Sequence, residues 1–163
     1  MKHRKSRRVR AARPAPKRVP GAAASTAANS SPESLPPIGA EGVSETSVRH
    51  SWTIQALDPR LPAVLSTPAM IGLMEHATVL AASADLPEGA ISVGTRIEVD
   101  HRKAVPPGAR VRTWARLVKH EGRFLIFEVE ARSGDHLIGK GLVARAVVEP
   151  EKHSAKAHAR LHE

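Results

Sequence analysis

One glutamate stands inside a mostly apolar stretch, STPAMIGLMEHATVLAA, which runs from residue 66 to residue 82. If this stretch is helical, the side chains one turn away from Glu75 are apolar or small: Ile71, Gly72, Thr78 and Val79. A carboxylate buried without a partner is costly, so it acquires either a raised pKa or a dedicated partner. Glu75 is therefore a candidate base or nucleophile. Periodicity alone favours the competing interpretation, a carboxylate that meets water or an arginine.

A second candidate for proton chemistry is His101, which ends the strand-like run IEVDH. An imidazole at a strand end can act as a base or an acid near neutral pH. Position alone favours a half-exposed histidine without a reactive role. His50 and His76 are given no catalytic role, and the sequence suggests no metal site.

Two adjacent basic residues, Arg102 and Lys103, come just before the turn VPPGA. Guanidinium and ammonium groups are the usual partners of phosphate oxygens, so both are candidates for binding a phosphorylated ligand. Adjacent basic residues are more often part of a solvated face, and that alternative stays open.

The helix that carries Glu75 has a well-marked start. Thr67 is a suitable N-cap, and Pro68 suits the first helical position, where its missing N–H costs nothing. The pattern predicts a helix from Pro68 to about Ala84. Nearly all its side chains are apolar, and it is too short to span a membrane, so we expect a central helix surrounded by other elements.

Strand-like segments flank this helix on both sides. Alternating apolar and polar residues predict a half-buried strand in SVRHSWTIQAL, residues 47–57. Four further runs are separated by Gly-rich or Pro-rich turns and predict strands at residues 90–102, 109–120, 123–132 and 136–149. The order of elements predicts an α+β fold in which a curved antiparallel sheet surrounds one long central helix.

The formal net charge of +9 is unevenly distributed along the 163 residues. Residues 1–44 hold nine Lys/Arg and two acidic residues, whereas residues 45–150 hold thirteen and twelve. We therefore predict a disordered basic arm rich in Ala, Pro and Arg (1–44), one folded domain (45–150) and a polar tail (151–163). Between an arm that binds a polyanion and a dispensable extension, the second interpretation is favoured, so we expect no nucleic-acid partner. No apolar run approaches the ~20 residues of a membrane-spanning helix, so we expect no membrane association. The chain has no cysteine, and we expect a cytoplasmic protein.

Three stretches together resemble the fluoroacetyl-CoA thioesterase-like family of hotdog-fold acyl-CoA thioesterases. They are TPAMIGLMEHA, GAISVGTRIEVDHRKAVPPGARV and GKGLVARAVVEPEK, and the resemblance extends from about residue 47 to residue 156. It implies a hotdog fold, hydrolysis of a short-chain acyl-CoA thioester without a cofactor or metal, and a homodimer with its sites at the subunit interface.

The resemblance also assigns roles to residues. It implies a catalytic set of Thr67, Glu75 and His101, with Glu75 acting as nucleophile or as base for water. It further implies that the Gly94 N–H lies beside the acyl carbonyl and that Arg145 has a supporting role at the substrate. Thr67 and Glu75 would be about 12 Å apart along the helix axis, too far to act on one carbonyl directly. They would have to come from different subunits or reach opposite ends of the substrate.

The family's lid of phenylalanines is missing, since Asp58 and Leu61 stand where those rings should be. This departure affects the choice of substrate rather than the type of reaction.

Two other functions remain as alternatives. One is a hotdog enoyl-CoA hydratase, although the chain lacks a hydratase-type Asp and His motif. The other is a non-catalytic module that binds or senses acyl-CoA, although the arm offers no helix-turn-helix.

Overall fold

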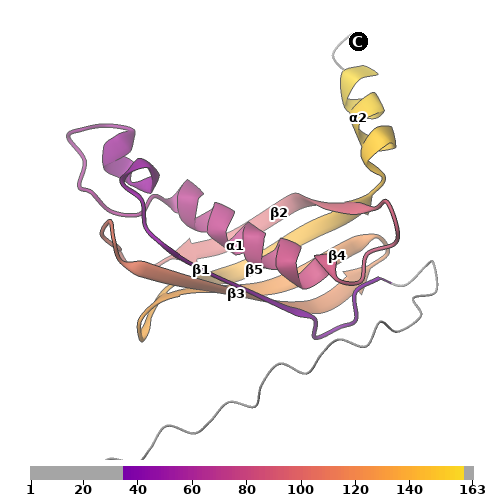
Figure 1. Cartoon of the computed structure of the whole chain (residues 1–163), viewed down its shortest axis with the longest axis horizontal. Coiled ribbons are helices and arrows are strands. Elements are labelled where there is room, and N and C mark those ends of the chain that lie inside the picture. Colours follow the sequence, from indigo (N-terminus) through magenta and orange to yellow (C-terminus); the bar gives the residue numbers. More distant parts are fainter. Residues whose placement is uncertain (1–34, 160–163) are drawn as a thin grey trace, which may run out of the picture.

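The computed structural model describes the backbone of residues 35–159 and the side chains of residues 35–155. This part of the chain forms a curved antiparallel sheet with one main helix across one of its faces, and a second helix projects from the end of the last strand (Figure 1). The α+β prediction is thus confirmed. In chain order the elements are β1 (Glu41–Ser47), η1 (His50–Trp52), η2 (Ile54–Ala56), α1 (Thr67–Ser83), β2 (Ile91–His101), β3 (Arg110–Glu121), β4 (Phe124–Ser133), β5 (His136–Val148) and α2 (Pro150–Ala159).

The five strands lie in the order β1-β3-β4-β5-β2, and each pairs with its neighbours antiparallel. Strands β3, β4 and β5 form a meander, and β1 and β2 lie at the two edges. Strand β2 pairs with β5 over its whole length, so within the described chain its other edge has no partner. An unpaired strand edge leaves backbone N–H and C=O groups that can pair with another chain.

The core lies between α1 and the concave face of the sheet. Helix α1 contributes Met70 and Met74, and the strands contribute Leu117, Leu125 and Phe127, all fully buried. The sheet covers only one side of the helix, so Val79 and Leu80 keep 38% and 41% of their surface exposed. The helix is central, as predicted, yet a single chain leaves part of its apolar surface uncovered.

The start of α1 differs by one residue from the sequence prediction. The helix begins at Thr67, and its N-cap is Ser66, whose Oγ accepts a hydrogen bond from the Ala69 N–H at 3.3 Å. Both residue types are good caps, and Pro68 is tolerated in the first turn in either register. Since Ser66 satisfies the helix end, the hydroxyl of Thr67 is free to bond elsewhere.

The first predicted strand is wrong. Residues 50–56 form the 3-10 turns η1 and η2, and the first strand is β1, which lies earlier in the chain. The buried residues of this segment, Val48 and Thr53, do not follow the alternation, and Thr53 Oγ1 donates to His50 O within the turns. Strand β1 escapes detection because it is polar and passes so close to α1 that a β-carbon at Gly42 would overlap the helix backbone.

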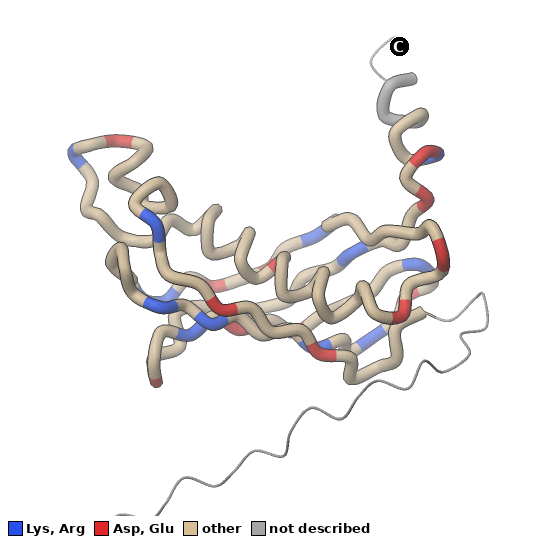
Figure 2. Tube along the Cα trace, in the orientation of Figure 1, with Lys and Arg blue, Asp and Glu red and all other residues tan. Residues whose placement is uncertain are grey.

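The proposed boundary between the arm and the domain also needs correction. Strand β1 begins at Glu41, inside the segment predicted as a disordered arm. The rest of that prediction, residues 1–34, lies outside the described residues. In the described part, basic and acidic positions are interspersed over the fold rather than gathered into one basic surface (Figure 2). None of the described helices is long and apolar enough to cross a membrane.

Candidate active site

The end of β2 meets the start of α1, and this contact joins two of the predicted site residues. Thr67 Oγ1 lies 2.9 Å from His101 Nδ1, which is hydrogen-bonding distance. The other ring nitrogen of His101, Nε2, is buried and has no hydrogen-bond partner among the described residues. A buried, unpaired imidazole nitrogen next to a bonded hydroxyl is equipped to exchange a proton with a bound substrate or water.

Glu75 lies further along α1 and faces the other half of β2. Its side chain is 33% exposed, and its Oε1 lies so close to Gly94 that a β-carbon at that position would overlap it. Any larger residue at position 94 would displace the carboxylate. The structure agrees with the interpretation that periodicity alone favoured, since the carboxylate is partly open to solvent and lies beside an arginine.

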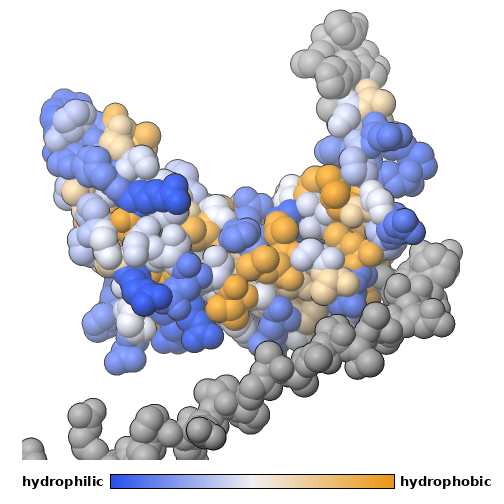
Figure 3. Space-filling view, viewed as in Figure 1, coloured by the Kyte–Doolittle hydropathy of each residue, from blue (hydrophilic) through white to orange (hydrophobic). Residues whose placement is uncertain are grey.

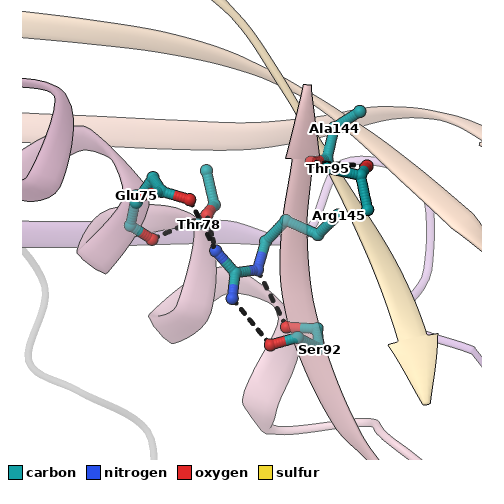
Figure 4. Close-up of polar contacts among 6 residues, drawn as sticks. All are labelled: Glu75, Thr78, Ser92, Thr95, Ala144 and Arg145. Carbon is teal, nitrogen blue, oxygen red and sulfur yellow. Dashed lines mark hydrogen bonds and ion pairs between the residues drawn. The ribbon is translucent and has the colours of Figure 1, made fainter. Parts of the chain in front are cut away.

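That partner is Arg145, which comes from β5 and is only 5% exposed (Figure 4). Its Nη1 lies 3.6 Å from Glu75 Oε1 and donates to Thr78 Oγ1 at 3.3 Å. Its Nε and Nη2 donate to the hydroxyl and carbonyl oxygens of Ser92, at 2.9 and 2.7 Å. Three donor nitrogens therefore fix the guanidinium in one orientation beside the carboxylate.

Burial lowers the pKa of Arg145, and the neighbouring Glu75 carboxylate opposes that shift. Arginine nevertheless stays protonated in proteins, so Arg145 provides a permanent positive charge beside Glu75. The sequence placed Arg145 among substrate-binding residues, whereas the structure places it beneath the carboxylate, where it acts on Glu75. Ser92 and Thr78 were missed because nothing in their local sequence shows that they bind a distant arginine.

The adjacent residues Arg102 and Lys103 make different contacts. Arg102 donates from Nη2 to Asp100 Oδ2 at 3.0 Å and forms an exposed ion pair with it. Lys103 lines a cavity of about 210 Å³ next to the β4–β5 hairpin. Two residues that look equivalent in the sequence therefore have different surroundings.

The predicted lid segment is an exposed loop. Leu57 and Leu61 are 77% and 41% exposed. Asp58 accepts hydrogen bonds from the side chain and the backbone N–H of Arg60, and these bonds hold the pKa of the Asp58 carboxyl below its usual value. The loop thus exposes apolar side chains and an ion pair in which Arg60 balances the charge of Asp58.

The two groups of site residues do not meet within one chain. Thr67 and His101 lie at one end of the helix and strand, whereas Glu75, Gly94 and Arg145 form the other group. His101 and Gly94 are seven residues apart on β2, which corresponds to about 23 Å at the rise of an extended strand. No cluster of three potential metal ligands occurs among the described residues.

Comparisons with known proteins identify the family of this chain. Residues 48–151 match the family described as fluoroacetyl-CoA-specific thioesterase, FlK. The chain is 42% identical over 109 residues to the fluoroacetyl-CoA thioesterase of Streptantibioticus cattleyicolor, and the match covers 67% of this chain and 78% of that protein.

Solved structures give the same result. The structure of the fluoroacetyl-CoA thioesterase FlK is similar with a TM-score of 0.70 and 37% identity, covering 76% of this chain and 96% of that chain. A thioesterase superfamily member from Thermus thermophilus is similar with a TM-score of 0.71 and 33% identity, covering 78% and 93%. A hot-dog-like protein from Thermanaerovibrio acidaminovorans has a TM-score of 0.70 and 26% identity, covering 76% and 92%. The predicted hotdog fold is thereby confirmed.

Proposed function

This chain belongs to the fluoroacetyl-CoA-specific thioesterase family, and from that premise we propose that it hydrolyses a short-chain acyl-CoA thioester to the free acid and coenzyme A. It is an acyl-CoA thioesterase by its family. The observation that carries the proposal is the Glu75 carboxylate, which is held between Gly94 and the buried Arg145 and is still partly open to solvent. One variant of the related FlK was solved in complex with acetyl-CoA, a short acyl thioester.

We further propose that a homodimer completes the site across its interface. If the open edges of two β2 strands pair antiparallel about a centre between Ile97 and Glu98, His101 comes to lie opposite Gly94 of the partner subunit. This pairing would bring the Thr67 and His101 group of one copy to the Glu75 group of the other. A twofold dimer then carries two equivalent sites.

The apolar surface at this edge supports the same arrangement. The face seen in Figure 3 shows apolar patches beside polar ones. Among the exposed apolar side chains, Val79 and Leu80 belong to α1, and Ile91 and Ile97 belong to β2. Pairing of two β2 edges would cover part of this surface and satisfy the open backbone groups of the strand.

In the proposed mechanism the thioester carbonyl lies between the two groups. Glu75 either attacks the carbonyl carbon or takes a proton from the attacking water. In both routes an electron pair moves onto the carbonyl oxygen, which the Gly94 N–H and the Thr67 hydroxyl stabilise. The carbon–sulfur bond then breaks, and His101 transfers a proton to the leaving thiolate. If Glu75 is the nucleophile, this step leaves an acyl anhydride on Glu75, and water hydrolyses that anhydride to release the free acid and restore the carboxylate. If Glu75 is the base for water, the free acid forms directly, Glu75 loses its proton to solvent and His101 regains one. This mechanism uses side chains and one backbone N–H, and the absence of a cofactor and the cytoplasmic location stay predictions.

A thiol-release assay across a panel of acyl-CoA substrates tests the proposed function. We expect turnover of short acyl groups, with kcat/KM values for fluoroacetyl-CoA and acetyl-CoA that agree within about tenfold. The reason is the lid, in which Asp58 and Leu61 replace aromatic rings. Selectivity of several hundredfold for the fluorinated substrate would show that another element provides the gate, and an absence of thiol release from every substrate would refute the function.

Mixing two inactive variants tests the shared site. His101→Ala and Glu75→Gln inactivate the two different halves of the proposed site. In a heterodimer of the two variants, one site therefore combines an intact His101 with an intact Glu75. We expect a refolded equimolar mixture to recover roughly a quarter of the wild-type rate, because about half of the dimers are mixed and each has one working site. A mixture of His101→Ala with Thr67→Ala is the control, since both changes affect the same half. Equal rates in the two mixtures would contradict a site shared between copies.

A further inference from the structure

A small cavity lies beyond the end of β2, close to the proposed reactive groups but separate from them. It is lined by Lys103, Ala104, Val105, Pro106, Ser133, His136 and Ile138. At about 210 Å³ it falls below the roughly 300–1,000 Å³ of pockets that enclose a drug-sized ligand. It can therefore accept one end of a coenzyme A molecule but not the whole molecule.

The floor of this cavity is apolar and fixed. Val105 and Ile138 are 2% and 1% exposed. Val105 O accepts from Leu65 N, and Ile138 O accepts from Arg102 N, both at 2.8 Å. These backbone bonds attach the loop after β2 both to β5 and to the segment leading into α1. The cavity is thus formed before any ligand arrives, which lowers the entropic cost of binding.

The rim of the cavity carries side chains of the types that commonly bind phosphate. Ser133 and His136 are directly paired across the β4–β5 hairpin, so their side chains lie on the same face of the sheet, within about 5.5 Å at the β-carbons. Lys103 lines the same cavity and forms no ion pair within the described chain, whereas the neighbouring Arg102 is bound to Asp100. No acidic side chain lines the cavity. An ammonium group, an imidazole and a hydroxyl therefore surround a space without a competing carboxylate.

From these contacts we infer that Lys103, Ser133 and His136 form a subsite for a phosphate group of coenzyme A. Lys103 follows His101 by two residues, so their Cα atoms are at most about 7 Å apart, and one substrate can contact both groups. The flexible pantetheine arm separates the thioester from the phosphates. The subsite rests on the proposed function and adds to it the recognition of the nucleotide end of the substrate.

The test compares substrates that share an acyl group but differ in their phosphates. Lys103→Ala is expected to raise KM for acyl-CoA about tenfold, the loss expected for one charge-assisted contact, while kcat stays unchanged. The same variant should leave KM for the acyl-pantetheine thioester unchanged, because that substrate has no phosphate. Acyl-dephospho-CoA separates the two sources: a smaller effect with this substrate assigns the subsite to the 3′-phosphate, and an equal effect assigns it to the diphosphate.

Matched variants complete the experiment. Lys140→Ala removes an exposed lysine that lines a different groove on the sheet, and it should not change KM for acyl-CoA. Lys103→Arg keeps the positive charge, so its KM for acyl-CoA should stay close to the wild-type value. An equal rise of KM with acyl-CoA and acyl-pantetheine, or a change below twofold in both Lys103→Ala and Lys103→Glu, would overturn the subsite. Calorimetry with coenzyme A alone keeps the two proposals distinguishable. If the wild type releases no thiol but binds coenzyme A in a Lys103-dependent manner, the thioesterase function fails and the subsite stands.

Discussion

Replacing Glu75 by glutamine is expected to lower kcat by at least about 10²-fold, which is the low end of what a positioned acid, base or nucleophile contributes. Glutamine keeps the shape of the side chain but can neither attack the carbonyl nor accept a proton at neutral pH. Thiol release under saturating substrate, measured together with thermal unfolding, checks this result. An active Glu75→Gln enzyme would refute the reactive role of the carboxylate.

The structure also alters the stability expected for this variant. A carboxylate buried without a partner would make Glu75→Gln stabilising. Glu75 is instead one-third exposed and lies beside Arg145, whose remaining bonds to Ser92 and Thr78 do not depend on it. We therefore expect Tm to change by only a few degrees in either direction. His76→Ala is the control, because His76 is exposed and lines a groove against β1, away from β2; it should leave kcat unchanged.

Gly94→Ala is the second substitution with a large expected effect, a loss of about 10²-fold in kcat/KM. The added methyl group would overlap Glu75 Oε1, so the carboxylate must move away from its place beside Arg145. A displacement of about 1 Å in a reacting group can cost that much. The backbone at Gly94 has no positive φ, so alanine introduces no strain there and the variant should fold.

Gly72→Ala provides the matched control for this prediction. Gly72 is an exposed residue of α1, and a β-carbon there would meet nothing within 4 Å. The change should leave kcat/KM unaltered and stabilise the helix by roughly 0.5–1 kcal/mol, the usual advantage of alanine over glycine inside a helix. Wild-type activity in Gly94→Ala would show that the position of the Glu75 carboxylate is not critical.

Much of the fold could be predicted because strong local patterns coincide with the elements that form. The apolar run around Glu75 is α1, and four alternating segments are β2 to β5 with bounds within two residues. The failures occurred where local pattern and tertiary environment differ. Residues 47–57 alternate like a strand but form turns, and β1 is a polar edge strand whose position depends on pairing with β3 and on the close approach of Gly42 to α1.

The sequence by itself determined which side chains this protein has for chemistry. Residue types made Glu75 and His101 candidates, because a nucleophile or base must be one of a few residue types wherever the chain places it, and the resemblance added Thr67 and the Gly94 N–H. The tertiary structure alone decided which of them meet. It places Thr67 within hydrogen-bonding distance of His101 and the buried guanidinium of Arg145 beside Glu75. It also places Lys103, but not Arg102, at the small cavity. Such contacts link residues up to 70 positions apart through the register of the sheet. Local sequence does not specify that register.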